Sequence, residues 1–253
     1  MHERRLYAHR GASAERPENT MPAFERAVEL GVDALEMDVQ LTRDEHLIVV
    51  HDDTAARTAA APVAWAELDL ADAQRLDAGW GFLAPDGSRP FAGQGIYAPT
   101  FEAVLDAFPS TRLNVDLKGA RAITAMLDLV KRKHAEERVT LASFQTRTAI
   151  QVRRAGYGGD TALSQGEVVT LLSLPAVLWR QLPFTGNAAQ VPVRQGAIHF
   201  DRPAFIAKCH SLGLRVDFWV IDDRAEAERL LALGADGIMT NDPAAIRPLF
   251  QPS

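Results

Sequence analysis

The sequence predicts a single α/β domain of the TIM (β/α)8 barrel class. Three observations lead to this fold: short apolar strands alternate with amphipathic helices, the alternation runs along the whole chain, and the chain has 253 residues. Alternation of this kind implies parallel strands with helices packed against them. Eight strand–helix units in about 250 residues is the usual size of such a barrel. We therefore expect one barrel domain over residues 1–253.

A repeated unit supports this interpretation: a helix, a short stop ending in glycine, and then an apolar strand. The stop is found at Leu30-Gly31, Leu212-Gly213, Leu233-Gly234 and, more loosely, Ala155-Gly156. Glycine just past a helix readily takes the left-handed conformation. We expect the eight barrel strands near residues 6–9, 34–39, 112–117, 139–143, 161–164, 196–200, 215–220 and 237–240. We expect helices over residues 22–30, 120–134, 147–154, 202–212 and 224–233.

Two segments interrupt the alternation. Residues 40–51 have the pattern of a hairpin with its turn at Asp44-Glu45, a register that would place His51 opposite Asp38. Residues 53–111 are too long for a simple connection, and we interpret them as containing a small insertion after the second barrel strand, lying over the barrel mouth. Its expected parts are a helix at 65–76, a loop rich in glycine and proline at 79–95, and a helix at 101–108. A separate domain is disfavoured by the length and apolar content of this segment.

Composition narrows the possible partners and location. The net charge of −6 gives no general attraction to nucleic acid or to an anionic membrane. The lone Cys209 excludes an intramolecular disulfide, and its helical surroundings predict a buried side chain. The N-terminal residues lack the apolar run of a secretory signal, and the most apolar stretch, 168–179, is too short to span a bilayer. We expect a cytoplasmic protein without stable membrane insertion.

His9 and Arg10 end the first predicted strand. Active sites of such barrels lie at the carboxyl ends of the strands. A histidine there can transfer protons near neutral pH, and an arginine offers a planar fork that suits phosphate oxygens. A solvated strand end is the other interpretation of this pair.

Glu36 and Asp38 alternate along the second predicted strand, so their side chains share one face. Facing the barrel interior, the two carboxylates would repel each other unless a cation lay between them. Asp116 ends the third predicted strand and completes an oxygen-only ligand set that favours Mg²⁺ or Ca²⁺. Lys118 follows with the same period as a second positive group for phosphate. In the alternative interpretation, Lys118 only neutralises the acids.

Several other side chains have weaker signals. Trp219 ends the seventh predicted strand and is expected to line the pocket or to pack in the core. His199, at the end of the predicted sixth strand, is placed within reach of the pocket. Thr20 has the sequence context of a helix cap before Pro22, and Glu18 and Asn19 are expected to brace the loop that carries His9.

The opening fifty-two residues resemble the glycerophosphodiester phosphodiesterase family. The motif residues are His9-Arg10-Gly11, Pro17-Glu18-Asn19-Thr20, Glu36-Met37-Asp38-Val39 and His51-Asp52. Later pieces match as well: Asp116-Leu117-Lys118, Ser143-Phe144, and Gly237-Ile238 with Thr240 and Asp242-Pro243. The family fold is a TIM barrel with a small insertion after the second strand.

The resemblance implies metal-dependent hydrolysis of glycerophosphodiesters to sn-glycerol 3-phosphate and an alcohol. It implies His9 and His51 as the general acid/base pair. The implied metal ligands are Glu36, Asp38 and Asp116, and the implied phosphate-binding residues are Arg10 and Lys118. The attacking group is either water or the glycerol 2-hydroxyl, and the family is thought to use the hydroxyl.

This chain departs from the family pattern in three places. Asp116 stands where glutamate is common, Asp222 stands where asparagine is expected, and residues 54–61 are rich in alanine. Two alternative functions therefore accompany the main one. One is a lysophospholipase D-like phosphodiesterase, for which the insertion offers Trp65, Trp80, Phe82 and Phe91 as an acyl groove. The other is a phosphodiester-binding protein without turnover.

Overall fold

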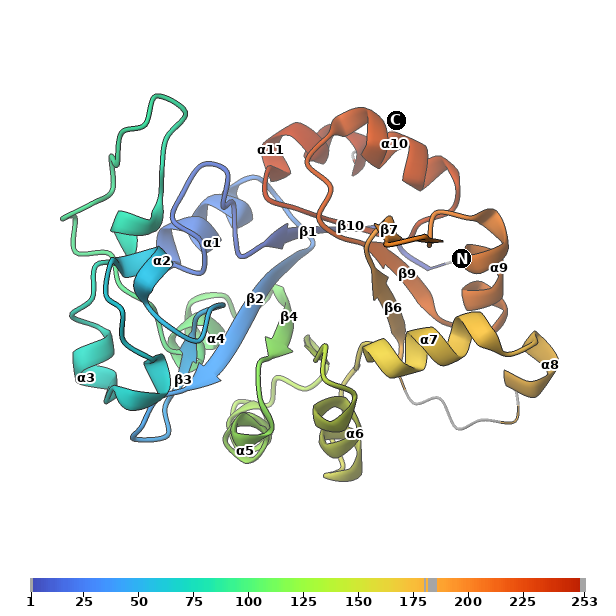
Figure 1. The fold of residues 1–253 in the computed structure, drawn as a ribbon, viewed down its shortest axis with the longest axis horizontal. Helices are drawn as coiled ribbons and strands as arrows, with labels where there is room; N and C mark the ends of the chain where they lie inside the picture. The colour runs from blue at the N-terminus through green and yellow to red at the C-terminus, as the bar shows by residue number, and fades with distance from the viewer. Residues whose placement is uncertain (1, 180, 182–185, 251–253) are drawn as a thin grey trace.

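A computed structural model describes residues 2–179, 181 and 186–250, and it contains the predicted barrel. Seven parallel strands form one curled sheet in the order β5-β4-β2-β1-β10-β9-β6 (Figure 1). Their bounds are β1 (Arg5–His9), β2 (Ala34–Leu41), β4 (Arg112–Leu117), β5 (Val139–Ala142), β6 (Ala188–Val191), β9 (Arg215–Phe218) and β10 (Gly237–Thr240). Thr161 bridges to Leu141 and Ala162 to Ala188, both in parallel, so residues 161–162 close the gap between β5 and β6.

Amphipathic helices cover the outside of the sheet. In α1 (Met21–Glu29), for example, Ala23, Phe24 and Ala27 are buried while the opposite face is polar. Gly31, just after this helix, has a φ of +75°, as the helix–glycine–strand pattern predicts. The other outer helices are α4 (Phe101–Ala107), α5 (Ile123–Arg132), α6 (Thr146–Arg154), α7 (Gln165–Ser173), α9 (Pro203–Ser211), α10 (Arg224–Ala232) and α11 (Pro243–Ile246). Shorter turns are η3 (Ala120–Ala122), α8 (Ala176–Trp179) and η4 (Arg247–Phe250).

The prediction of the sixth barrel strand at residues 196–200 is wrong. The strand that pairs with β9 is β6, whose sequence Ala-Ala-Gln-Val carries little of the β-branched and aromatic character that marks a strand. Residues 196–200 instead belong to a small hairpin of β7 (Arg194–Gln195) and β8 (Ile198–His199). Gly196, with a φ of +60°, supplies the turn between its two strands. His199 therefore does not end a barrel strand.

The hairpin after the second strand exists, but its register differs by one residue from the prediction. β3 (Leu47–Val49) pairs antiparallel with β2, with Leu47 opposite Leu41. The Val50 amide donates to the Asp38 carbonyl at 2.9 Å, so His51 does not lie opposite Asp38. The turn is centred on Asp44 rather than between Asp44 and Glu45. His51 follows β3 and still returns to the cavity at the carboxyl ends of the strands.

The segment between β3 and α4 forms a small apolar cluster of its own. It contains α2 (Ala56–Ala59), η1 (Trp65–Glu67), α3 (Leu70–Ala73) and η2 (Ala78–Gly81), which lie beside β3 on the flank of the barrel in Figure 1. The helix predicted at 65–76 is interrupted at Leu68, whose backbone is extended. Trp65 is buried against Ile48 and Val50 of the hairpin. Apart from His51, which comes shortly after β3, no described residue of this segment lines the cavity at the carboxyl ends of the strands, so a position over the barrel mouth stays a prediction.

Within the described ranges, every helix is either too short or too polar to cross a bilayer.

Candidate active site

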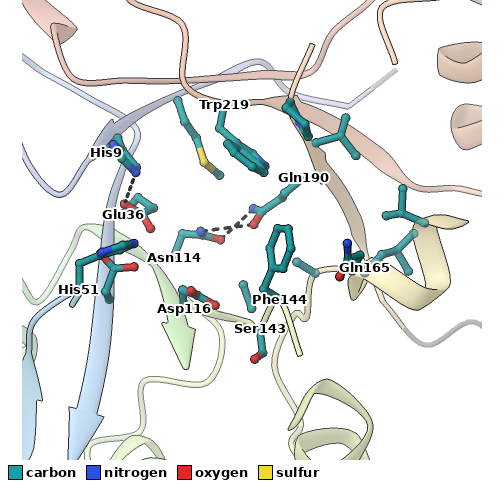
Figure 2. A pocket seen from close by; sticks show the side chains of 18 of the residues that line it. His9, Glu36, His51, Asn114, Asp116, Ser143, Phe144, Gln165, Gln190 and Trp219 are labelled. Atoms are coloured by element: carbon teal, nitrogen blue, oxygen red, sulfur yellow. Dashed lines mark hydrogen bonds and ion pairs between the residues drawn. The ribbon is translucent and has the colours of Figure 1, made fainter. Parts of the chain in front are cut away.

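A cavity of about 350 Å³ opens at the carboxyl ends of the barrel strands (Figure 2). Strands from opposite sides of the barrel contribute side chains to it. All eight predicted site residues line this cavity: His9, Arg10, Glu36, Asp38, His51, Asp116, Lys118 and Trp219. His199 does not line it; its side chain is 43% exposed and lies 3.6 Å from Asp201. The barrel thus brings together residues up to 210 positions apart.

His9 is held at the end of β1 with its two ring nitrogens in different environments. Nδ1 lies 2.7 Å from the Oδ1 atom of Asn241, and Nε2 lies 3.9 Å from a carboxylate oxygen of Glu36. Burial lowers the pKa of the His9 imidazole, and the nearby Arg10 guanidinium lowers it further. The ring is therefore neutral at neutral pH. Asn241 follows the last strand, and no pattern in the sequence indicates its contact with His9.

The three predicted carboxylates meet where β2 and β4 run side by side. Asp38 and Asp116 are register partners, and Glu36 lies two residues earlier on β2. Glu36 is 6% exposed and accepts a hydrogen bond from the Arg10 backbone amide at 2.9 Å. Burial and the adjacent Asp38 raise the pKa of Glu36 well above its usual range. Burial also raises the pKa of Asp116.

Two cations compensate the remaining negative charge. The Lys118 ammonium lies 2.7 Å from Asp38 and 2.6 Å from Asp116, while Arg10 Nε lies 3.2 Å from Asp38. Burial alone would raise the pKa of Asp38, but the charges of Lys118 and Arg10 outweigh it and lower that pKa. Burial also opposes the charge of Lys118, whose pKa is nevertheless raised by Asp116 and Asp38. Both predicted phosphate-binding groups thus lie in the cavity but contact carboxylates.

His51 is anchored by a chain of ion pairs that the sequence did not indicate. Its Nδ1 lies 2.6 Å from Asp52, and the other Asp52 oxygen lies 2.7 Å from Arg57. Arg57 also pairs with Glu18, which in turn accepts from Arg10 at 2.9 Å. The chain joins the start of the insertion to the loop after β1. It fixes His51 and Arg10 to one set of partners.

Asn19 contacts a carboxylate in addition to bracing the loop after β1. Its side-chain amide donates to Asp38 at 3.0 Å, and its backbone has a φ of +56° that asparagine tolerates better than most residues. Its backbone amide also donates to the Arg10 carbonyl at 3.0 Å. Asn19 therefore braces the loop after β1, as predicted, and orients a carboxylate as well.

The chemistry of the three carboxylates suits a hard cation, although their spacing in this structure does not form a metal site. All three predicted ligands offer oxygen. Burial is the largest cause of the raised pKa values of Glu36 and Asp116, so their ionised forms are disfavoured without a cation nearby. The Lys118 ammonium, however, lies between Asp38 and Asp116. In the part of the chain that the structure describes, no group of three or more His, Cys, Asp or Glu side chains is spaced to hold a metal ion.

The opposite wall of the cavity is apolar. Trp219 and Phe144 meet edge to face with ring centroids 6.4 Å apart, and Phe144 is 54% exposed at the rim. The larger apolar side chains that also line the cavity are Leu163, Val168, Val191, Phe200 and Met239. Between the two walls, the Gln190 amide donates to Asn114 at 2.9 Å (Figure 2). One wall can thus hold an anionic group while the other accepts an apolar one.

The Glycerophosphoryl diester phosphodiesterase family model matches residues 9–245 of this chain. A glycerophosphodiester phosphodiesterase of Caldanaerobacter subterraneus subsp. tengcongensis is 31% identical over 251 residues, which cover 95% of each protein. A human lysophospholipase D is 28% identical over 275 residues, covering 95% of this chain and 84% of the human protein.

Solved structures agree at the level of the fold. A glycerophosphodiester phosphodiesterase of Agrobacterium tumefaciens superposes with a TM-score of 0.80 at 22% identity, covering 98% of this chain and 100% of the other. A phosphodiesterase of Oleispira antarctica, in complex with the product sn-glycerol-3-phosphate, has a TM-score of 0.79 at 21% identity, covering 96% and 95%.

Proposed function

Because this chain belongs to the glycerophosphoryl diester phosphodiesterase family, we propose that it hydrolyses glycerophosphodiesters to sn-glycerol 3-phosphate and an alcohol. One observation carries the proposal: two anchored imidazoles, two cations and three carboxylates line one cavity of about 350 Å³. The product bound to the structurally similar Oleispira protein supports the same substrate class.

His9 and His51 act as the acid/base pair. Each ring has its Nδ1 atom on a fixed partner, Asn241 or Asp52, which leaves Nε2 as the nitrogen that can exchange a proton with substrate. One imidazole removes the proton from the attacking oxygen, and the other protonates the leaving alkoxide. The attacking oxygen is either water or the glycerol 2-hydroxyl, which would form a cyclic phosphate first. A substrate lacking the 2-hydroxyl separates the routes, because undiminished turnover would exclude the cyclic one.

Arg10 and Lys118 bind the phosphate. Both are charged, lie in the cavity lining and are only partly exposed, so an incoming diester would compete for them with Asp38 and Asp116. A guanidinium fork and an ammonium both donate hydrogen bonds to phosphate oxygens. These two side chains would stabilise charge that builds on the phosphate as the bond breaks.

Glu36, Asp38 and Asp116 would hold one divalent cation, Mg²⁺ or Ca²⁺. When bound, such an ion would supply positive charge that offsets the negative charge of the phosphate. The grouping of three carboxylates on the adjacent strands β2 and β4 supports this proposal, and the position of Lys118 between Asp38 and Asp116 supports the alternative of neutralisation by lysine alone.

The test is release of glycerol 3-phosphate from glycerophosphocholine, glycerophosphoethanolamine and glycerophosphoglycerol, with chelator and with each cation added back. We expect release from at least one diester, loss with chelator, and recovery with Mg²⁺ or Ca²⁺. Unchanged release with chelator would support the lysine alternative. Thermal stabilisation by the diesters without any product would instead indicate a binding protein and contradict the proposed activity.

A second substrate class is favoured by the apolar wall. Trp219, Phe144 and Val168 lie opposite the charged residues, so a lysophospholipid could place its phosphate on one side and apolar chain on the other. The predicted groove of insertion aromatics does not line this cavity; the described wall comes from later parts of the barrel. Comparing lysophosphatidylcholine with glycerophosphocholine distinguishes the two substrates.

The proposed location is the cytoplasm, with which the buried, unpaired Cys209 agrees.

A further inference from the structure

The contact between His9 and Asn241 has a defined polarity, because a third residue fixes the Asn241 amide. The Asn241 side-chain nitrogen donates to the Oδ2 atom of Asp222 at 2.8 Å. A carboxylate has no proton to donate, so the amide atom that faces Asp222 must be the nitrogen. The amide oxygen of Asn241 then faces His9, with Oδ1 2.7 Å from Nδ1.

This polarity selects one protonation form of the neutral imidazole. The Asn241 oxygen can only accept a hydrogen bond, so His9 Nδ1 must carry the proton. The lone pair of the neutral ring is then on Nε2, the nitrogen on the Glu36 side of the ring, within the cavity lining (Figure 2). The opposite tautomer would set a lone pair against the Asn241 oxygen and leave Nε2 unable to accept a proton.

Asp222 lies in the loop after β9 and is itself held by residues at the end of β10. Its Oδ1 atom accepts from the Thr240 hydroxyl at 2.9 Å and from the Asn241 backbone amide at 2.7 Å. The Ile221 amide donates to the Met239 carbonyl at 2.9 Å, which continues the pairing of β9 with β10. The Asp222 carboxylate therefore has a separate donor on each oxygen, and its orientation is set by the end of the barrel.

We propose that Asn241 and Asp222 are positioning residues that hold His9 in the Nδ1–H tautomer, with Nε2 available to substrate. His51 has a different anchor, the Asp52 carboxylate, so the two imidazoles are fixed independently. The proposal builds on the proposed function, in which His9 exchanges a proton with substrate. Neither Asn241 nor Asp222 needs to touch the diester.

The test combines kinetics with the ¹⁵N chemical shifts of the His9 imidazole, recorded well above the ordinary pKa of histidine. Wild type is expected to have the Nδ1–H signature. Asn241→Ala should give a mixture of tautomers and a kcat lower by about 10- to 100-fold with little change in KM, the size of effect seen for residues that orient an active group. The His51 shifts, measured in the same spectra, should not change.

The double variant Asp222→Asn with Asn241→Asp exchanges the carboxylate and the amide, so that an acceptor still faces His9 Nδ1. The new carboxylate can accept from His9 Nδ1–H, and the new amide can donate to it. We expect this double variant to regain the Nδ1–H signature and most of the lost kcat. Asp223→Asn is the matched control. Asp223 is adjacent to Asp222 in the sequence, but its carboxylate caps α10 by accepting from the Glu226 backbone amide. It should leave both measurements unchanged.

A folded Asn241→Ala protein that keeps the Nδ1–H tautomer and wild-type kcat would overturn the proposal. So would a folded double variant as slow as Asn241→Ala. The spectra do not depend on turnover: if wild type releases no product but has the Nδ1–H signature that Asn241→Ala loses, the positioning role stands and the proposed activity fails.

Discussion

At the scale of single residues, each reactive group in the cavity is fixed by a partner of opposite polarity. Asp38 forms ion pairs with Lys118 and Arg10 and accepts a hydrogen bond from Asn19. His51 is anchored on Asp52. Fixed partners reduce the reorganisation that must accompany charge movement in a reaction. The same contacts change the pKa values of the groups involved, and this makes their contribution measurable in the protein without substrate.

Asp52 provides the first such measurement. Burial would raise its pKa, but hydrogen bonds from Arg57 and His51 lower it to about 2, from an ordinary value of 3.8. Because the folded-state pKa is depressed, the stabilisation is present above the ordinary value and is lost as pH falls toward 2. Its size should be about 1 kcal/mol at most, since Asp52 is partly exposed.

The measurement is urea unfolding as a function of pH for wild type and Asp52→Asn. The difference between the two proteins should shrink as pH falls from about 5 to about 2. Asp53→Asn, at the next position, is the control and should not reproduce the trend. A difference that stays constant over this range would contradict the assigned partners of Asp52.

At the scale of elements, the strand ends supply the active groups and the loops that follow them fix the orientation. The pattern of apolar strands placed Glu36, Asp38 and Asp116 correctly on neighbouring strands, because period-two alternation determines which side chains share a face. It did not indicate Asn241, Asp222, Arg57 or Asn19 as partners. Their contacts depend on loop conformation, which periodicity does not encode.

The loop after β1 depends on close contact with α1 at Gly11. A Cβ atom there would lie 2.7 Å from the backbone and Cβ of Ala23, and the Gly11 φ is +80°. Gly11→Ala should therefore combine the cost of a left-handed conformation, about 1–2 kcal/mol, with an overpacking cost of about 1–3 kcal/mol.

Gly156→Ala is the matched control, since Gly156 has a φ of +81° with nothing within 4 Å of the added Cβ. It should lose only the conformational part. Urea denaturation of the two variants measures the difference, and equal losses would show that the contact with α1 does not constrain the loop that carries Arg10.

At the scale of the whole molecule, the barrel was predictable from the sequence, but the position of its sixth strand was not. Repeated helix–glycine–strand units indicated β2, β9 and β10, and the strands expected at 6–9 and 112–117 correspond to β1 and β4. The prediction of the sixth strand failed because β6 consists of two alanines, a glutamine and a valine, whereas the expected segment 196–200 supplies Ile198 and His199 to a small hairpin. Likewise, the carboxylate cluster was predictable from alternation, but the position of the Lys118 ammonium between two of its members was not.

The barrel as a whole matters because it brings His9 and His51 to one cavity from separate elements. The central claim is that these two imidazoles cleave the diester. Its most direct test is the rate of glycerol 3-phosphate release by His9→Ala and His51→Ala, with His46→Ala, on the exposed hairpin turn beside Asp44, as control. The account predicts a loss of about 10²–10⁴-fold for each of the first two variants, folded as wild type, and no loss for the control. A folded His9→Ala or His51→Ala protein that releases product at the wild-type rate would contradict it.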